Sequence, residues 1–381
     1  MIYLNNAATT YPKPPCVQEA FMKCVRDVPA GQMRSSFESE PGDVLDECRR
    51  SVAGLLGVSD WKRIFFTSGA TEASNLFIRG MDWTGKYVLA SQTEHNSILR
   101  PVMNHPDLKG KVTVLPCDDE GYIASSLVEE ASGEGQGVLI VSHCSNVTGI
   151  IQPLDELALA AKQRGYLLAV DISQSAGCIP VEGDRWGADI LIFTGHKSLM
   201  GLQGTGGIYI RKGLGIRPLK YGGTGRDSAK LVCGTDPDQY EYEPGTQNIA
   251  GIAALKAGAD YVTGLGLEAI RRKEAQQCGW LYDQLAAIQG VRLYGPGQAW
   301  QRGPMLSFNI EGLTAADTAY ILNNSYGIIV RAGLHCAPLI HDRIGSGKHG
   351  TVRVSISCET GWEELMAFVD AVREICGSLM V

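Results

Sequence analysis

The sequence predicts an α/β protein, in which a large domain with a mostly parallel seven-stranded sheet is followed by a smaller α+β C-terminal domain. The chain has 381 residues, which is more than one small hydrophobic core accommodates. From residue 43 to about residue 212, short apolar runs alternate with helical patterns. This alternation is typical of a parallel sheet that is covered by helices on both faces.

The first helix of the alternating pattern is expected at residues 42–57, where apolar residues recur on one helical face. Further helices are expected at residues 70–80 and 153–165. Seven short apolar runs are expected to form the sheet: IFFTS (64–68), KYVLASQ (86–92), KVTVLP (111–116), GVLIVSH (137–143), YLLAVDIS (166–173), ADILIFTG (188–195) and GGIYIRK (206–212).

Residues 213–247 are rich in Gly, Asp and Pro and predict a long loop, which is usually functional at this length. A helical stretch at 248–289 leads into the small domain. Its expected elements are strands at VRLYG (291–295), MLSFNIEG (305–312), IIVRAG (328–333) and TVRVSIS (351–357), and helices at 314–327 and 362–376. We expect residues 15–250 to form the large domain, and residues 1–14 and 251–381 the small one.

Composition and charge argue against several classes of protein. The net charge is -7 and no block of like charge occurs, so we expect no nucleic-acid surface. No stretch reaches the roughly 18 apolar residues of a membrane span, and the first residues do not resemble a signal peptide, so we expect a cytoplasmic protein. The 11 cysteines include no C-x-x-C pair, so we expect no metal site and mostly free, buried thiols.

Unusual polar residues follow three of the expected strands. Asp171 ends YLLAVDIS, His196 and Lys197 follow ADILIFTG, and His95 follows KYVLASQ. In open α/β sheets, ligands bind just beyond the carboxyl ends of the strands. A lysine in such a place is ordinarily a surface residue, but the glycines and hydroxyls of TGHKSLMGLQGTGG favour a ligand site instead.

An aspartate and a lysine presented in this way suit pyridoxal phosphate. This cofactor forms a Schiff base with a lysine, and an acidic residue keeps its ring nitrogen protonated. Its phosphate needs free N–H groups at a helix N-terminus, which Gly69, Ala70 and Thr71 would supply in SGATEASN. A nucleotide site is not supported, because GSGKHG lacks the Walker spacing and GTGGIY is not G-x-G-x-x-G.

Nine motifs now follow one another along nearly the whole chain: YLNNAATT, SGATEASNL, TEHNS, SNVTG, VDISQSAG, FTGHKSLMG, YEPGTQN, RAGLHCAP and TVRVSIS. In order and spacing they resemble the class V aminotransferase family of pyridoxal-phosphate enzymes, most of all the group II cysteine desulfurases and selenocysteine lyases. The resemblance implies the fold type I architecture of these transferases and a homodimer. It also implies conversion of L-cysteine to L-alanine, with sulfur held as a persulfide and then delivered to a protein or small-molecule acceptor.

The resemblance also implies a role for individual residues. Lys197 would carry the cofactor, Asp171 would hold the pyridinium nitrogen, Gln174 would touch the ring hydroxyl, and His95 would stack on the ring and take part in proton transfers. The phosphate would be bound by the start of the helix at Ala70 and Thr71, by Thr194 and His196, and by Thr246 of a second subunit. Asn146, Arg353 and Arg331 would serve the substrate, and Cys336 would accept the sulfur.

Cys336 could instead be a buried structural thiol at the end of a strand. As an acceptor it must be exposed, mobile and deprotonated, and an ordinary thiol is only a few per cent ionised at neutral pH. His335 and Arg331 are expected to raise that fraction, and Gly333 and Pro338 suit a loop that aims one side chain. Cys144 and Cys358 are expected to be core thiols.

Several alternatives use the same lysine. The chain could be a selenocysteine lyase or a cysteine sulfinate desulfinase, for which Cys336 need not be essential. It could also be an aminotransferase of the same fold, or a scaffold without activity. The motifs depart from group II at Leu334, where a second histidine is frequent, and at Ala70, where a threonine is frequent. The preferred chalcogen, the acceptor, and the role of His341, His349 and the loop at 342–350 stay open.

Overall fold

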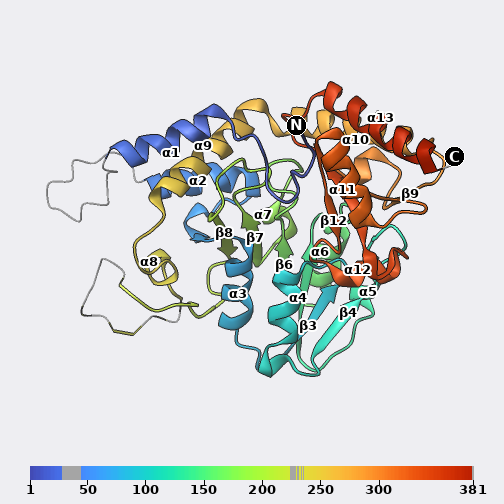
Figure 1. The fold of residues 1–381 in the computed structure, drawn as a ribbon. Helices are drawn as coiled ribbons and strands as arrows, with labels where there is room; N and C mark the ends of the chain where they lie inside the picture. The colour runs from blue at the N-terminus through green and yellow to red at the C-terminus, as the bar shows by residue number, and fades with distance from the viewer. Residues whose placement is uncertain (28–43, 224–228, 230, 233, 235, 380–381) are drawn as a thin grey trace.

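A computed structural model describes residues 1–27, 44–223, 229, 231, 232, 234 and 236–379. Its largest sheet has seven strands in the order β2-β8-β7-β6-β5-β3-β4 (Figure 1). β8 runs antiparallel to both of its neighbours, and the remaining pairs are parallel, which confirms the mostly parallel sheet. The strands are β2 (Ile64–Thr67), β3 (Lys86–Ser91), β4 (Val112–Leu115), β5 (Gln136–Ser142), β6 (Leu167–Asp171), β7 (Ile190–Thr194) and β8 (Gly206–Ile210).

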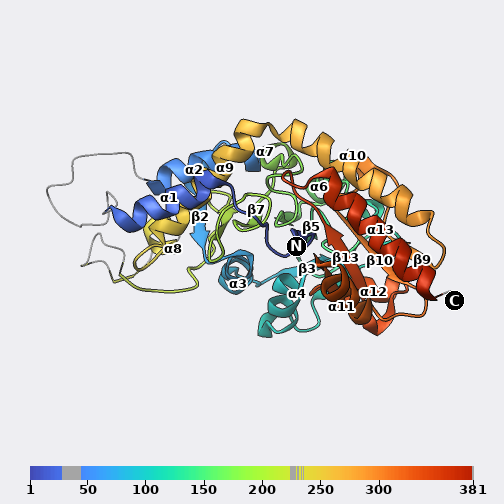
Figure 2. The same ribbon diagram turned by 45° about the horizontal axis from the view of Figure 1, so that its top comes forward.

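Both faces of this sheet are buried, as the continuous apolar runs require. In β5, Val138 and Ile140 pack in one hydrophobic cluster with α3 (Ala70–Gly80) and α4 (Asn96–Met103). Their neighbours Leu139 and Val141 point the other way, into a cluster with residues of α2 (Val44–Leu56) and α6 (Leu154–Gln163). Figure 2 shows α3 and α4 on one side of the sheet and α2 and α7 (Gly183–Trp186) on the other.

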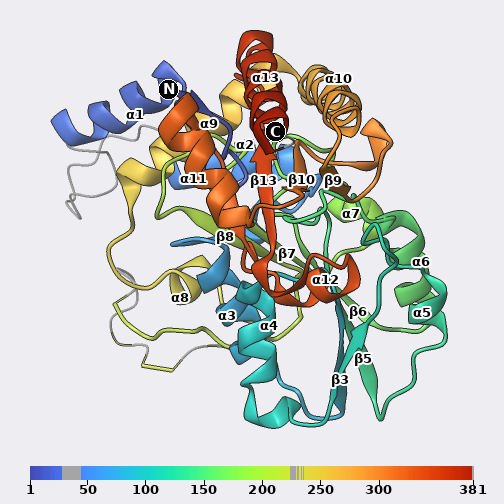
Figure 3. The same cartoon turned by 45° about the vertical axis from the view of Figure 1, so that its right-hand side comes forward.

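The C-terminal part is built on a four-stranded antiparallel sheet of order β12-β13-β10-β9. Its strands are β9 (Val291–Tyr294), β10 (Met305–Ile310), β12 (Arg331–Gly333) and β13 (Thr351–Ser355). The helices α10 (Leu267–Ala286), α11 (Ala315–Tyr326) and α13 (Trp362–Leu379) lie beside these strands (Figure 3). The N-terminus belongs here, because β1 (Ile2–Tyr3) pairs in parallel with β11 (Ile328–Ile329). The smaller α+β unit is therefore confirmed.

Two predicted elements are wrong in detail. The segment IIVRAG forms β11 and β12, which belong to different sheets, rather than one strand. The stretch 248–289 forms α9 (Ile249–Leu265) and α10 (Leu267–Ala286), separated at Gly266, whose φ of 82° lies in the region that favours glycine. The division at residue 250 stays a prediction, and α9 packs against α1 (Pro15–Arg26) and α2.

The remaining short helices complete the described chain: η1 (Trp61–Arg63), η2 (Pro106–Leu108), α5 (Ser126–Glu129), α8 (Gln239–Tyr242), η3 (Ala299–Gln301), α12 (Pro338–Arg343) and η4 (Gly347–His349). The predicted long loop at 213–247 therefore contains one short helix, and parts of it lie outside the described residues. None of the helices described here is long and apolar enough to cross a membrane.

Candidate active site

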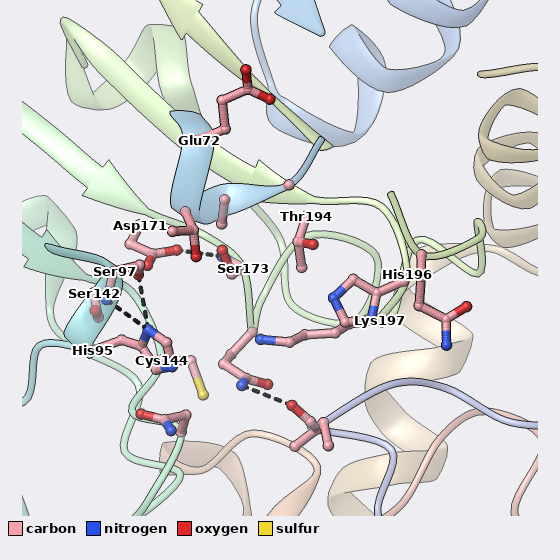
Figure 4. Close-up of a pocket in the computed structure, with 18 of the residues that line it drawn as sticks. Glu72, His95, Ser97, Ser142, Cys144, Asp171, Ser173, Thr194, His196 and Lys197 are labelled. Atoms are coloured by element: carbon pink, nitrogen blue, oxygen red, sulfur yellow. Dashed lines mark hydrogen bonds between the residues drawn. The ribbon is translucent and has the colours of Figure 1, made fainter. Parts of the chain in front are cut away.

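A cavity of about 340 Å³ opens at the carboxyl ends of the central strands (Figure 4). β6 ends at Asp171 and β7 at Thr194, and both residues line the cavity. The structure brings 11 of the residues singled out in the sequence to this one cavity: Ala70, Thr71, His95, Asn146, Asp171, Gln174, Thr194, His196, Lys197, Arg331 and Arg353.

The amine of Lys197 extends into the cavity from the turn after β7, toward the wall that carries Asp171 and His95 (Figure 4). Burial lowers the pKa of Lys197 to about 8. The carboxylate of Asp171 opposes this shift, while Arg353 and Arg331 add to it. The amine is therefore far easier to deprotonate than an ordinary lysine, as a nucleophilic or basic lysine requires.

Asp171 is buried at the end of β6, and its Oδ1 accepts the N–H of Ser173 at 2.9 Å. Gln174 follows in the same turn. Its Nε2 donates to the carbonyl of Ala7 at 3.1 Å, which leaves Oε1 as an acceptor at the cavity wall. Asp171 thus offers a carboxylate, and Gln174 an amide oxygen, to a polar ring.

His95 caps the N-terminus of α4. Its Nδ1 accepts the backbone N–H of Ser97 at 3.0 Å and lies 2.8 Å from the Ser97 hydroxyl. Because Nδ1 is an acceptor, the proton of the neutral ring is on Nε2. Burial and the charge of Lys197 lower the pKa of His95 to about 4, with Asp171 opposing. At neutral pH the ring is uncharged and is a hydrogen-bond donor through Nε2.

The start of α3 forms an anion site at the cavity. Its N-cap is Gly69, so no side chain caps the helix and the first N–H groups stay available. Gly69 has a φ of 150°, and a Cβ on Gly206 would lie 2.6 Å from its Cα, so both positions need glycine. Nearby His196 is neutral, since burial lowers its pKa to about 4, and its buried Nδ1 has no partner.

The N-terminal segment closes one side of the cavity. Ala7 and Ala8 line it, and only the motif YLNNAATT hinted at this in the sequence. The carbonyl of His196 accepts the ammonium of Lys13 at 2.8 Å and the N–H of Thr10 at 3.0 Å. The turn that carries Lys197 is therefore fixed by Thr10 and Lys13, which are far away in the sequence.

Two arginines lie directly opposite each other on β12 and β13, Arg331 beside Arg353. Like charges in this position repel, so the pair needs an anion to offset the cost. Arg353 is fully buried and its Nε has no partner, although Nη1 donates to the carbonyl of Asn146 at 2.8 Å. Burial and Arg331 lower its pKa to about 9, which leaves it a cation at neutral pH.

Cys336 lies beside the cavity in a constrained loop. His335 and Cys336 have φ values of 50° and 62°, a strained conformation typical of functional loops. Asn146 donates to the carbonyl of His335 at 2.6 Å, and the N–H of Asn96 donates to that of Cys336 at 2.7 Å. The Cys336 side chain is partly exposed, and Nη2 of Arg331 donates to its Sγ at 3.3 Å. It is therefore not a core thiol.

The expectation that His335 promotes ionisation of this thiol is wrong. Its Nε2 lies 3.0 Å from both the carbonyl and the hydroxyl of Thr351. Burial and Arg353 lower the pKa of His335 to about 2, so it carries no charge. Arg331 supplies the positive charge at the sulfur instead.

Thr246 does not line the cavity of its own chain. It lies in an adjacent hollow of about 240 Å³, which shares Ser68, Glu72 and Gly204 with the cavity. Cys144 lines the cavity but is buried, and burial raises its pKa to about 12, so it is an un-ionised thiol. In the described part of the chain, no three histidine, cysteine or acidic side chains are grouped to hold a metal ion.

These groups match what pyridoxal phosphate needs. An uncapped helix start and an unpartnered His196 suit the phosphate, Asp171 suits the ring nitrogen, and Lys197 suits the aldehyde. The guanidinium of Arg353, whose Nε has no partner, suits a second anion, such as a substrate carboxylate. Together with the fold, the site defines the class of protein as a fold type I pyridoxal-phosphate transferase.

Comparisons with known proteins give the same class. The model of the family described as aminotransferase class-V matches residues 2–368. A probable cysteine desulfurase of Halobacterium salinarum is 32% identical over 98% of this chain and 91% of its own length. One from Methanothermobacter thermautotrophicus is 31% identical over 99% and 95%. The chain belongs to the aminotransferase class-V family.

Two solved structures of cysteine desulfurases are similar in fold to this chain. The apo cysteine desulfurase of Thermococcus onnurineus has a TM-score of 0.87 at 31% identity, covering 99% of this chain and 95% of that one. The cysteine desulfurase CsdA of Escherichia coli has a TM-score of 0.86 at 26% identity, covering 100% and 95%.

Proposed function

We propose that this protein binds pyridoxal phosphate and converts L-cysteine to L-alanine, passing the sulfur to Cys336 and then to an acceptor. The observation that carries the proposal is the contact between Arg331 and Cys336, because it sets a thiol beside a cation at the edge of the lysine cavity. The relatives named cysteine desulfurases support the same activity.

The cofactor would be held from several sides. Lys197 would bind the aldehyde, and Asp171 would hold the ring nitrogen. Oε1 of Gln174 would accept a hydrogen bond from the ring hydroxyl, and His95 would stack on one face of the ring. Its phosphate would be bound by the residues gathered at the anion site, namely Ala70, Thr71, Thr194 and His196. When bound, the cofactor acts as an electron sink for the pair left behind when the substrate loses its Cα proton.

Lys197 would remove that proton. Its amine is neutral in a large fraction of molecules near pH 8, because of burial, and so can act as a base. His95 would act as a donor through Nε2, since Nδ1 is already occupied by Ser97. The substrate carboxylate would lie against Arg353 and the amide of Asn146, one of whose N–H groups holds the cysteine loop.

Cys336 would take the sulfur. Its thiolate, held beside the positive charge of Arg331, would attack the substrate sulfur, so that an S–S bond forms while the substrate Cβ–S bond breaks. The electron pair of the broken bond stays with the three-carbon product, which takes up protons and leaves as alanine. A thiol acceptor would then attack the outer sulfur of the persulfide, so that the S–S bond breaks and the Cys336 thiolate is released. The acceptor need not enter the cavity, because Cys336 lies beside it and is partly exposed.

Two further parts of the proposal concern the assembly and its location. Thr246 would bind the phosphate of a second subunit, since it lies in the hollow next to its own cavity.

The ten cysteines of the described residues are all free, which suits a reducing compartment such as the cytoplasm.

The decisive experiment combines a spectrum with a product assay. The purified protein should be yellow, with the absorption band of the lysine-bound cofactor, and Lys197→Ala should lose that band. With L-cysteine and a reductant it should release sulfide and alanine in equal amounts, and Cys336→Ala should abolish sulfide release, whereas Cys24→Ser should not. A colourless protein, or full activity in Cys336→Ala, contradicts the proposal. Parallel assays with selenocysteine and cysteine sulfinate identify the preferred substrate.

A further inference from the structure

A buried carboxyl group lies behind the cavity and has no part in the function proposed above. Glu94 is 0% exposed and immediately precedes His95. Its Oε1 accepts the hydroxyl of Ser91 at 2.5 Å and the backbone N–H of Ser142 at 2.6 Å, while Oε2 lies 2.8 Å from the Ser142 hydroxyl. Both of its oxygens are therefore used.

These contacts join the carboxyl ends of two strands of the large sheet. Ser91 is the last residue of β3 and Ser142 the last of β5. In the register of the sheet, Ser142 is paired with Asp171 on β6, and Ser142 itself lines the cavity. A single side chain thus connects the backbone that carries His95 with the strand that lies next to Asp171.

The surroundings of Glu94 disfavour a negative charge. No ion pair in the described part of the chain involves Glu94, and its partners are hydroxyls and one N–H. The charged group that acts on it is Asp171, another acid, and the neighbouring His95 is neutral. Burial first, and then Asp171, raise the pKa of Glu94 to about 8 against the three favourable hydrogen bonds.

We propose that Glu94 is a positioning residue that acts as an un-ionised carboxylic acid. It ties the ends of β3 and β5 together, and so aims His95 and supports Asp171 without bringing a second negative charge to the ring nitrogen site. Asp171 can then remain the one carboxylate there. In the un-ionised form the proton would be on Oε2, and the 2.8 Å contact with the Ser142 hydroxyl would then have the acid O–H as its donor and the hydroxyl as its acceptor.

The effect on the reaction rests on the proposed function, but the protonation of Glu94 can be tested without it. Infrared spectra of the cofactor-free protein at pH 6.5 should contain the C=O stretching band of a protonated carboxyl group that is missing in Glu94→Gln. Glu274→Gln is the matched control, because Glu274 is also buried with a pKa raised to about 8, but it lies on α10 rather than next to His95. Glu274→Gln should remove the band of the Glu274 carboxyl group and leave the band of Glu94 unchanged.

The pH dependence of folding stability is a second test of the protonation of Glu94. Glu94 stays protonated in the fold up to about pH 8, whereas in the unfolded chain it ionises above its ordinary pKa of roughly 4.3. Folding stability from this group is therefore lost as pH rises between these values, by about tenfold in the unfolding equilibrium constant per pH unit. The Tm of Glu94→Gln relative to wild type should rise from pH 5.5 to 7.5.

With the cofactor bound, Glu94→Gln keeps the shape of the side chain but cannot ionise. Its activity therefore shows whether the reaction depends on the charge of residue 94 or on the position of its side chain. Glu94→Gln should keep kcat within about threefold of wild type at pH 7, whereas Glu94→Ala should lower kcat by about tenfold or more with little change in KM. In Glu94→Ala, the pH at which the cofactor band changes should also move, because His95 and Asp171 are no longer fixed.

The proposal is overturned by any of three results. These are a spectrum in which Glu94→Gln removes no protonated band, a Tm difference that does not grow with pH, or a kcat of Glu94→Gln as low as that of Glu94→Ala. Should the protein fail to act on cysteine, the infrared and Tm measurements still decide the state of Glu94.

Discussion

Arg331 and Cys336 are in direct contact, with Nη2 of the arginine donating to Sγ of the cysteine at 3.3 Å. The guanidinium therefore lies where it can stabilise negative charge on the sulfur during the proposed sulfur transfer. The contact spans only five residues, and the positive φ values of Gly333, His335 and Cys336 bring the sulfur back toward the strand that carries Arg331.

The first prediction follows from this contact. Arg331→Met should lower the rate at which iodoacetamide alkylates Cys336 at pH 7 by about fivefold, because the sulfur loses its neighbouring positive charge. Mass spectrometry of the peptide that contains Cys336 measures this rate. Cys24, which is also free and partly exposed, is the internal control and should react equally in both proteins. An unchanged rate at Cys336 would show that Arg331 does not act on the sulfur.

A second prediction concerns pH. Only the neutral amine of Lys197 can attack the cofactor aldehyde, and burial lowers its pKa to about 8. The rate at which cofactor-free protein takes up pyridoxal phosphate should therefore rise with pH up to about 8 and level off above it. Absorbance in a stopped-flow instrument measures the rate, with Lys197→Ala as the blank. A rate that keeps rising toward pH 10 would mean that the amine is unperturbed.

A third prediction tests the N-terminal segment. Lys13→Met removes the charged hydrogen bond to the His196 carbonyl and should weaken cofactor binding by about fivefold to tenfold. Equilibrium dialysis against pyridoxal phosphate measures the change. Lys23→Met is the control, since Lys23 is exposed on α1. Equal affinities of the two variants would argue that the segment does not fix the Lys197 turn.

A fourth prediction concerns the small unit. Phe308 on β10 is fully buried and its ring meets that of Phe368 on α13 edge to face, with centroids 5.9 Å apart. Phe308→Ala should cost about 3–5 kcal/mol of unfolding free energy, measured by chemical denaturation. Tyr320→Ala, at a site that is 69% exposed, should change it by less than about 0.5 kcal/mol. Similar losses in both variants would contradict the assigned core.

The large sheet could be predicted because its strands are continuous apolar runs, and β7 is buried at every position. The gathering of Asp171, Lys197 and His95 could be predicted because residues at the carboxyl ends of parallel strands meet. The division of IIVRAG could not, because the partner strands of β11 and β12 are far away in the sequence. α4 was also missed, since it is only eight residues long and contains Pro101.

The directions of the side chains at the site could not be predicted from the sequence either. The spacing of His335 and Cys336 indicates that they are close, but it cannot tell that the imidazole turns toward Thr351 while Arg331 turns toward the sulfur. In the same way, the sequence of Glu94 and His95 does not reveal that one faces the strands and the other the cavity. Both depend on contacts with distant segments.

The cavity is walled by both ends of the chain, with Ala7 and Ala8 on one side and Arg353 on β13 on another. Ser355 on that strand accepts the N–H of Ala7 at 2.9 Å, so the opening residues dock only after β13 exists. During synthesis on the ribosome, the large sheet can form while this pocket is still unfinished. Cofactor capture therefore becomes possible only after β13 has been synthesised and folded, and a chain that stops before this strand cannot hold the cofactor in this way.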